Sequence, residues 1–124
     1  MNMYEFDPFM AEPEIDIAAA IFRLLGDATR VRLVALLLDG EASVSELVDG
    51  SGREQSAVSQ HLAKLRLGNL VTSRRDGPRI IYRLANDHVR QLLVDGLQHA
   101  EHIGSDTPGH HQRVRAVDSG VRRA

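Results

Sequence analysis

A chain of 124 residues is long enough for one domain with a modest hydrophobic core, and too short for two. Because aromatic residues make up only 4% of the chain, the core must consist mainly of Leu, Val, Ile and Ala, which favours a small helical domain. The formal net charge of −2 means that any nucleic-acid-binding surface must be local, and the absence of cysteine excludes disulfides, thiolate metal sites and thiol redox sensing.

The N-terminal region begins with an acidic segment over residues 1–14, which we expect to be a flexible arm. Residues 15–25 then place four apolar side chains on one side of a predicted helix: Ile17, Ile21, Leu24 and Leu25. This apolar run is too short to span a bilayer, and no basic segment precedes it. We therefore expect no membrane partner and no signal peptide, and the lack of cysteine is compatible with the cytoplasm.

Two further helices are predicted from their start signals. Asp27 or Thr29 can cap a helix that runs to Leu38. Ser43 can cap a short helix, with Glu46 three residues later in the arrangement of a capping box.

A tight turn predicted at Gly50-Ser51-Gly52 leads into a helix over residues 55–66. Two helices joined by a short turn that contains glycine form the pattern of a helix-turn-helix. One side of the second helix carries the apolar residues Val58, Leu62 and Leu65. Its other side is polar and almost free of carboxylates, with Gln55, Ser56, Ser59, Gln60 and Lys64.

Those polar side chains suit a helix that lies against DNA, because Ser and Lys reach phosphates and Gln reads base edges. The alternative is an ordinary amphipathic helix with a solvated face.

Residues 70–75 and 79–84 are β-type runs on either side of Asp76-Gly77-Pro78, which predicts a hairpin. Between residues 53 and 83 the only acidic residues are Glu54 and Asp76. The same stretch contains seven basic residues: Arg53, Lys64, Arg66, Arg74, Arg75, Arg79 and Arg83. Such a local excess of positive charge is typical of a surface that contacts phosphates. An edge strand protected against aggregation is the alternative for the hairpin arginines.

A last helix is predicted over residues 87–103, ending at Gly104. We expect residues 15–103 to form one domain for DNA binding and dimerisation, followed by a flexible tail over residues 104–124 that contains His and Arg.

Five of the six histidines lie at or after the start of this last helix. His99 and His102 share one helix face, and His88 lies on the same side about 16 Å away along the axis, at about 1.5 Å per residue. Ligands of one ion each lie within about 2.2 Å of it, so a single helix cannot bring His88 and His99 to one metal. An antiparallel helix from a second subunit can, so the spacing predicts a metal site across a dimer. The alternative is a solvated helix face that happens to carry histidines.

Three stretches carry a family resemblance: Leu24-Leu-Gly-Asp-Ala-Thr-Arg-Val-Arg-Leu33, Ser56-Ala-Val-Ser-Gln-His-Leu-Ala-Lys-Leu65 and Arg75-Asp-Gly-Pro-Arg-Ile-Ile-Tyr-Arg-Leu84. Over roughly residues 15–103 the chain resembles the winged-helix repressors of the ArsR/SmtB family. The resemblance implies a mainly α fold with a small β-hairpin, and a homodimer that forms through the terminal helices and binds double-stranded operator DNA. It also implies that Gln55, Ser56, Ser59 and Gln60 face DNA and that Arg75 and Arg79 belong to the wing.

Members of the family that bind metal on their C-terminal helix carry Asp-x-His near the start of that helix and His-x-x-His or His-x-x-Glu near its end. Here Asn86-Asp-His88 and His99-Ala-Glu-His102 occupy those positions, so Asn86 replaces the first ligand. The pattern looks most like the nickel- and cobalt-responsive repressors of the KmtR type, in which histidines of the tail complete a larger shell. The resemblance implies a site for Ni(II) or Co(II), with Zn(II) as a further possibility, formed by His88, His99, Glu101, His102, His110 and His111.

Together these features predict a metal-responsive transcriptional repressor. The alternatives are a winged-helix DNA-binding regulator without metal sensing and a winged-helix adaptor that binds other proteins. An enzyme is not expected, because the sequence shows no nucleophile–base pairing and no phosphate-binding Gly loop. No small organic substrate is expected either.

Overall fold

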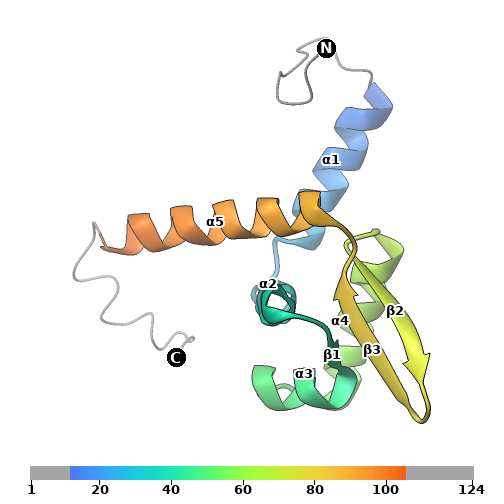
Figure 1. The fold of residues 1–124 in the computed structure, drawn as a ribbon. Coiled ribbons are helices and arrows are strands. Elements are labelled where there is room, and N and C mark those ends of the chain that lie inside the picture. The colour runs from blue at the N-terminus through green and yellow to red at the C-terminus, as the bar shows by residue number, and fades with distance from the viewer. Residues whose placement is uncertain (1–11, 106–124) are drawn as a thin grey trace. The chain divides into compact units, whose positions relative to one another are not determined.

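The computed structural model describes residues 12–105, which divide into two compact units between Asn86 and Asp87. The second unit contributes one described helix, α5 (Asp87–Ser105). The first unit contains α1 (Glu12–Leu24), α2 (Ala28–Leu36), the 3-10 segment η1 (Leu37–Asp39), β1 (Ala42–Ser43), α3 (Val44–Ser51), α4 (Gln55–Leu67), β2 (Val71–Asp76) and β3 (Arg79–Leu84) (Figure 1). This is the mainly helical winged helix-turn-helix with a small sheet that the sequence predicted.

Both predicted helix caps are confirmed. The side chain of Asp27 accepts a hydrogen bond from the backbone N–H of Arg30 at 3.0 Å, which caps α2. At α3, the hydroxyl of Ser43 accepts from the N–H of Glu46 at 3.1 Å, and the Glu46 carboxylate accepts from the N–H of Ser43 at 2.8 Å. This reciprocal pair is a complete capping box, so the start of α3 is specified by local sequence.

Two helices are longer than predicted. The first begins at Glu12 rather than Ile15, so residues 12–14 are helical instead of part of the arm. Pro13 lies in the first turn, where a missing N–H costs nothing, and acidic residues at 12 and 14 suit the positive end of the helix dipole. Helix α5 continues through Gly104 to Ser105. Residues 1–11 and 106–124 of the predicted arm and tail lie outside the described residues.

The turn between α3 and α4 begins later than predicted. Helix α3 continues through Gly50 to Ser51, and of the three residues predicted for this turn only Gly52 adopts the left-handed conformation, with φ of 69°. Gly50 has a packing role instead, because a Cβ there would lie 3.1 Å from the side chain of Leu36.

The hairpin is confirmed, and a third strand joins it. Strands β2 and β3 are antiparallel around Gly77-Pro78, with Gly77 at φ of 63°. Strand β1 pairs with the other edge of β3, so the strand order is β1-β3-β2. A strand of two residues carries too little periodicity to be predicted, and it forms here because it lies beside β3.

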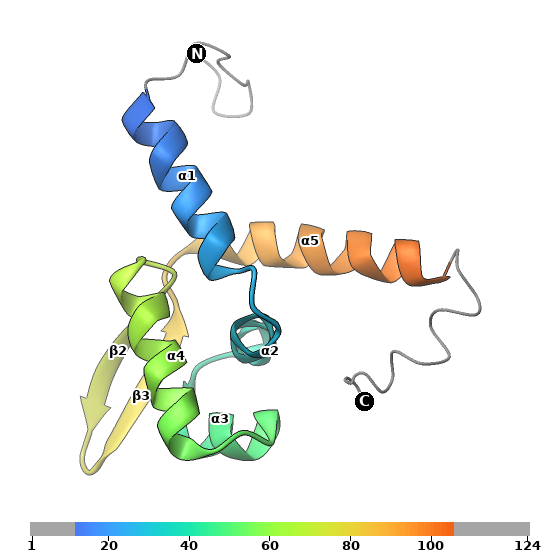
Figure 2. The same cartoon turned by 180° about the vertical axis from the view of Figure 1, so that it is seen from behind.

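The core of the first unit lies where α2, α3 and α4 pack on one another (Figure 2). It consists mainly of aliphatic side chains, as the composition required: Leu33, Val34, Leu37, Leu47, Val58, Leu62, Leu65, Leu70 and Val71. Helix α1 contributes no buried residue. It meets α4 where Leu24 lies over Gly68, since a Cβ on Gly68 would come within 2.2 Å of the Leu24 side chain.

Candidate nucleic-acid interface and histidine-bearing helix

Helix α4 separates its two faces as the sequence predicted. Val58, Leu62 and Leu65 are fully buried. The polar side chains predicted to face DNA are all exposed: Gln55, Ser56, Ser59, Gln60 and Lys64. The buried stripe anchors the helix, so its polar face is presented to solvent on a rigid support.

A hollow of about 270 Å³ brings part of this face next to the hairpin. Gln55 and Ser59 from α4 line it together with Arg79 from the start of β3. The start of α3 completes the lining with Ser43, Val44 and Ser45, and the hairpin adds Pro78 and Ile80. Hydroxyls, an amide and a guanidinium therefore surround one concave surface, which suits a negatively charged, hydrogen-bonding partner.

The remaining predicted DNA contacts are exposed but do not line this hollow. Ser56, Gln60 and Lys64 are exposed on α4 outside the lining of the hollow. Arg75 is exposed on β2, where its guanidinium donates to the carbonyl of Gly77 at 3.5 Å.

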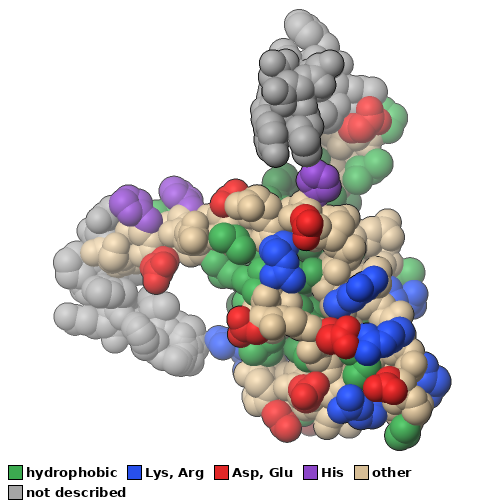
Figure 3. All heavy atoms as spheres, in the orientation of Figure 1, with side chains coloured by type: hydrophobic (Ala, Val, Ile, Leu, Met, Phe, Trp, Pro, Cys, Tyr) green, Lys and Arg blue, Asp and Glu red, His purple; other side chains and the backbone are tan. Residues whose placement is uncertain are grey.

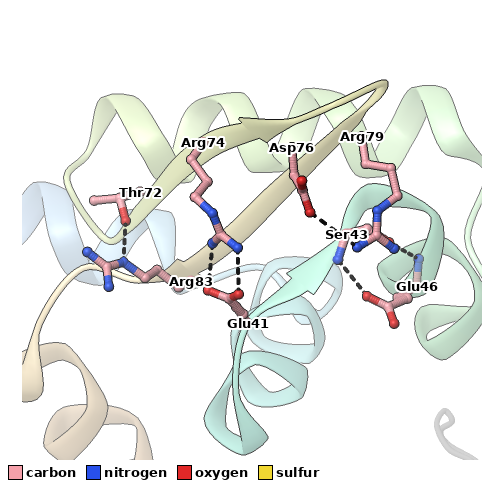
Figure 4. A network of polar contacts seen from close by, with 8 residues as sticks. All are labelled: Glu41, Ser43, Glu46, Thr72, Arg74, Asp76, Arg79 and Arg83. Carbon is pink, nitrogen blue, oxygen red and sulfur yellow. Dashed lines mark hydrogen bonds and ion pairs between the residues drawn. The ribbon is translucent and has the colours of Figure 1, made fainter.

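More acidic side chains lie near the hairpin than the sequence alone indicated. Acidic residues from before and within α3 reach the hairpin, so Glu54 and Asp76 are not its only counter-charges. Arg74 donates two hydrogen bonds to Glu41, at 2.7 and 2.8 Å, and Figure 4 shows the two side chains facing each other across the sheet. Hydrogen bonds from Arg74 lower the pKa of Glu41, and the same bonds raise the pKa of Arg74.

Arg79 is held less tightly. Its guanidinium lies 3.8 Å from the carboxylate of Asp76, and both side chains are more than half exposed. The pKa of Glu46 is lowered first by the backbone and side-chain hydrogen bonds of Ser43, and to a lesser degree by the charge of Arg79. Figure 3 shows the resulting mixture of Lys or Arg and Asp or Glu side chains over the hairpin side of the molecule.

His61, in the middle of α4, forms a hydrogen bond to a residue of α2. A guanidinium can only donate, so Nδ1 of His61 accepts from Nη1 of Arg30 at 3.2 Å. Nε of Arg30 also donates to the carbonyl of Leu24 at 2.6 Å. This arginine therefore connects the end of α1 to the middle of α4.

The candidate metal ligands of α5 are exposed: His88, His99, Glu101 and His102. Figure 3 shows imidazole side chains toward both ends of this helix. Within residues 12–105, no group of three or more His, Cys, Asp or Glu side chains is close enough to hold one metal ion. His110 and His111 lie outside the described residues. The donor types on α5, imidazole nitrogen and carboxylate oxygen, fit Ni, Co or Zn, but one described helix does not gather enough of them.

Four residues of this surface were not predicted from the sequence. Val44, Ser45 and Ile80 line the hollow, and Glu41 holds Arg74. No spacing rule links Glu41 to a residue 33 positions away, and only the pairing of β1 with β3 could have indicated it.

Comparison with known proteins identifies related sequences. A family model described as "Bacterial regulatory protein, arsR family" matches residues 27–73. The "HTH-type transcriptional regulator KmtR" of Mycobacterium tuberculosis is 46% identical over 113 residues, which are 91% of this chain and 86% of that protein. The similarity therefore extends well beyond the helix-turn-helix.

Solved structures share the fold. The crystal structure of M. tuberculosis Rv0081 is 34% identical, with a TM-score of 0.69, and the match covers 77% of this chain and 97% of that one. The solution structure of the homodimeric winged helix-turn-helix domain of Mycobacterium bovis Mb0332 is 27% identical, with a TM-score of 0.70, over 78% of this chain and 90% of that one. Among residues 12–105, no helix is long and apolar enough to cross a membrane.

Proposed function

Because this chain belongs to the ArsR family of bacterial transcriptional regulators, we propose that it is a metal-responsive repressor that binds operator DNA as a homodimer. Its family and its winged-helix fold are those of regulators and not of enzymes. In this proposal it acts on DNA in the cytoplasm, and residues 15–103 carry both DNA binding and dimerisation.

The hollow between α4 and the hairpin is the observation that carries DNA binding. It brings Gln55 and Ser59 of α4 within one concave surface with Arg79 of the wing. In this arrangement α4 enters the major groove, where Gln55 and Ser59 reach base edges and phosphates, and Arg79 contacts the adjacent backbone. The other side chains proposed to contact DNA are Ser56, Gln60, Lys64 and Arg75.

Exposed apolar side chains support dimerisation through the terminal helices. In α1, Ile17 and Phe22 are each 60% exposed, and in α5 Ile103 is 50% exposed. Apolar side chains on helices that a single chain leaves open are typical of an oligomer interface. The related Mb0332 domain is described as homodimeric.

Metal binding is proposed at α5 and the tail, with ligands drawn from His88, His99, Glu101, His102, His110 and His111. Imidazole and carboxylate donors suit Ni(II) and Co(II), which accept six ligands, whereas Zn(II) is usually bound by four. The described residues of one chain supply no group of three, so a metal site here would need the tail or a second subunit. Metal binding then favours the dimer state with the lower affinity for DNA, which is the coupling that regulation requires.

The experiment is a titration of fluorescently labelled operator DNA with metal-free protein, repeated with Ni(II), Co(II) and Zn(II). We expect one of the first two metals to weaken operator binding by about 5- to 150-fold. The variant His88→Ala should keep operator binding and lose this response, whereas Gln98→Ala, an exposed neighbour on the same helix, should keep both. Operator affinity that none of the three metals changes would contradict metal sensing and leave DNA binding intact.

The second candidate is a winged-helix regulator that responds to another signal. It is favoured by the observation that residues 12–105 of one chain hold no ready cluster of metal ligands. Equilibrium dialysis separates the two candidates, because this regulator would bind operator DNA and retain no stoichiometric metal.

A further inference from the structure

Among the hairpin arginines, Arg74 has the most strongly engaged guanidinium. Its Nη1 and Nη2 donate to the two carboxylate oxygens of Glu41 at 2.7 and 2.8 Å, so the contact is bidentate (Figure 4). By comparison, Arg79 approaches Asp76 only to 3.8 Å, and Arg83 donates to the hydroxyl of Thr72 at 3.3 Å.

The sheet brings these two residues together from opposite edges. Glu41 immediately precedes β1, and Arg74 lies on β2, with β3 between the two strands. Ser43 and Arg74 are both paired with Ile81 in the register, so the end of β1 and the middle of β2 lie at the same level of the sheet. Arg83, on the intervening strand, adds a second positive charge near Glu41.

Solvent reaches both partners, because the side chains of Arg74 and Glu41 are 53% and 46% exposed. A DNA phosphate can therefore approach the same guanidinium. Carboxylate and phosphate oxygens compete for the same planar fork of N–H donors, and the contact with one excludes the bidentate contact with the other.

We propose that Glu41 occupies the place of a DNA phosphate on Arg74 and so withdraws this arginine from the wing's contacts with the DNA backbone. The inference rests on the proposed function, since it assigns a role within DNA binding. Glu41 is then a residue that sets how strongly the wing binds any duplex. Because phosphate contacts supply affinity without reading sequence, fewer of them on the wing limit non-specific binding.

An exposed ion pair is weak, so the expected effect is moderate. Removing the carboxylate should increase affinity for a random-sequence duplex by about two- to fivefold per subunit, which corresponds to the usual strength of an exposed pair. Each phosphate that Arg74 gains should also make the slope of log Kd against log salt steeper by about 0.9.

The test compares Glu41→Gln with Asp49→Asn, a matched control that removes one negative charge from an exposed residue of α3. Binding of each full-length variant to a random-sequence duplex is measured by fluorescence anisotropy at several salt concentrations. We expect Glu41→Gln to show the tighter binding and steeper slope, and Asp49→Asn to remain close to the wild type. Arg74→Gln should bind like the wild type, and the double variant Glu41→Gln/Arg74→Gln should lose the gain.

The result that overturns the inference is equal behaviour of Glu41→Gln and Asp49→Asn, or a loss of affinity in Arg74→Gln as large as that in Arg79→Gln. Either outcome, obtained with wild-type protein that binds DNA, leaves the proposed function standing. Wild-type protein that shows no salt-dependent binding to any duplex would instead reject DNA binding, and the inference with it.

Discussion

Single arginines of this protein have distinct roles although they look alike in the sequence. Arg30 donates to the carbonyl of Leu24 and to the ring of His61, so it holds elements of the fold together. Arg74 is engaged by Glu41, and Arg79 lines the hollow next to α4. Only the last of these combines exposure, a loose partner and a position beside the polar face of α4.

Arg79 is therefore the wing residue expected to contact a phosphate. The substitution Arg79→Ala should weaken binding to all duplexes to a similar extent and reduce the salt slope by about one, because one phosphate contact is lost. The measurement is DNA affinity over a series of salt concentrations, with Arg74→Ala as the matched control on the same hairpin. An unchanged slope in Arg79→Ala would remove this residue from the phosphate contacts.

At the scale of elements, the capping box connects the helix-turn-helix to the sheet. Ser43 caps α3 through its side chain and pairs with Ile81 of β3 through its position in β1. The residue is buried, and its hydroxyl and backbone N–H are both satisfied by Glu46. Ser43 thus fixes the start of α3 at the point where the chain leaves strand β1.

Ser43→Ala should lower the free energy of unfolding by about 1 kcal/mol, which is the usual loss for an N-cap. Ser45→Ala, in the first turn of the same helix, is the matched control and should have little effect. The measurement is chemical denaturation followed by circular dichroism. Equal stability of Ser43→Ala and Ser45→Ala would show that the cap contributes little.

The same box predicts a pH dependence. Hydrogen bonds from Ser43 lower the pKa of Glu46 below its ordinary value of 4.5, so the folded state favours the carboxylate. Its contribution to stability is complete above that value and is lost as the pH falls through the lowered pKa. We expect Glu46→Gln to be less stable than the wild type at pH 7, with the difference shrinking below about pH 4.5. A difference that stays constant down to pH 3 would contradict this linkage.

At the scale of the whole molecule, α1 is a helix of 13 residues with no buried side chain in the single chain. Ile15 and Phe22 lie two turns apart on one side of it, 40% and 60% exposed. An isolated helix of this length is marginal in water, and most helical stability in proteins comes from packing of an apolar face. We therefore expect the apolar side of α1 to pack against a second copy of the chain.

Phe22→Glu should raise the dissociation constant of the dimer by at least about tenfold, since burial of a Phe side chain contributes roughly 1.5–3 kcal/mol. Arg23→Glu, which places the same side chain at an exposed position of α1 outside the side that carries Ile15 and Phe22, is the control. Sedimentation equilibrium measures the constant for both variants. A dimer unaffected by Phe22→Glu would exclude this side of α1 from the interface.

The sequence by itself determined the local structure and the division of α4 into two faces. Caps at Asp27 and Ser43, the buried stripe of Val58, Leu62 and Leu65, and the hairpin around Gly77 were all predicted. These features depend on residues a few positions apart, so short-range spacing carries the information. The family followed from motifs of the same kind, and the comparisons confirm it.

Only the tertiary structure decided which of the exposed residues act together. The hollow formed by Gln55, Ser59 and Arg79, the strand β1, and the contact between Glu41 and Arg74 join positions that are far apart in the chain. Each arises because the sheet and the helix-turn-helix pack into one unit, which sets distances that no periodicity encodes. The positive charge of the hairpin could thus be counted from the sequence, whereas the part of it available to DNA depends on what the fold places beside each arginine.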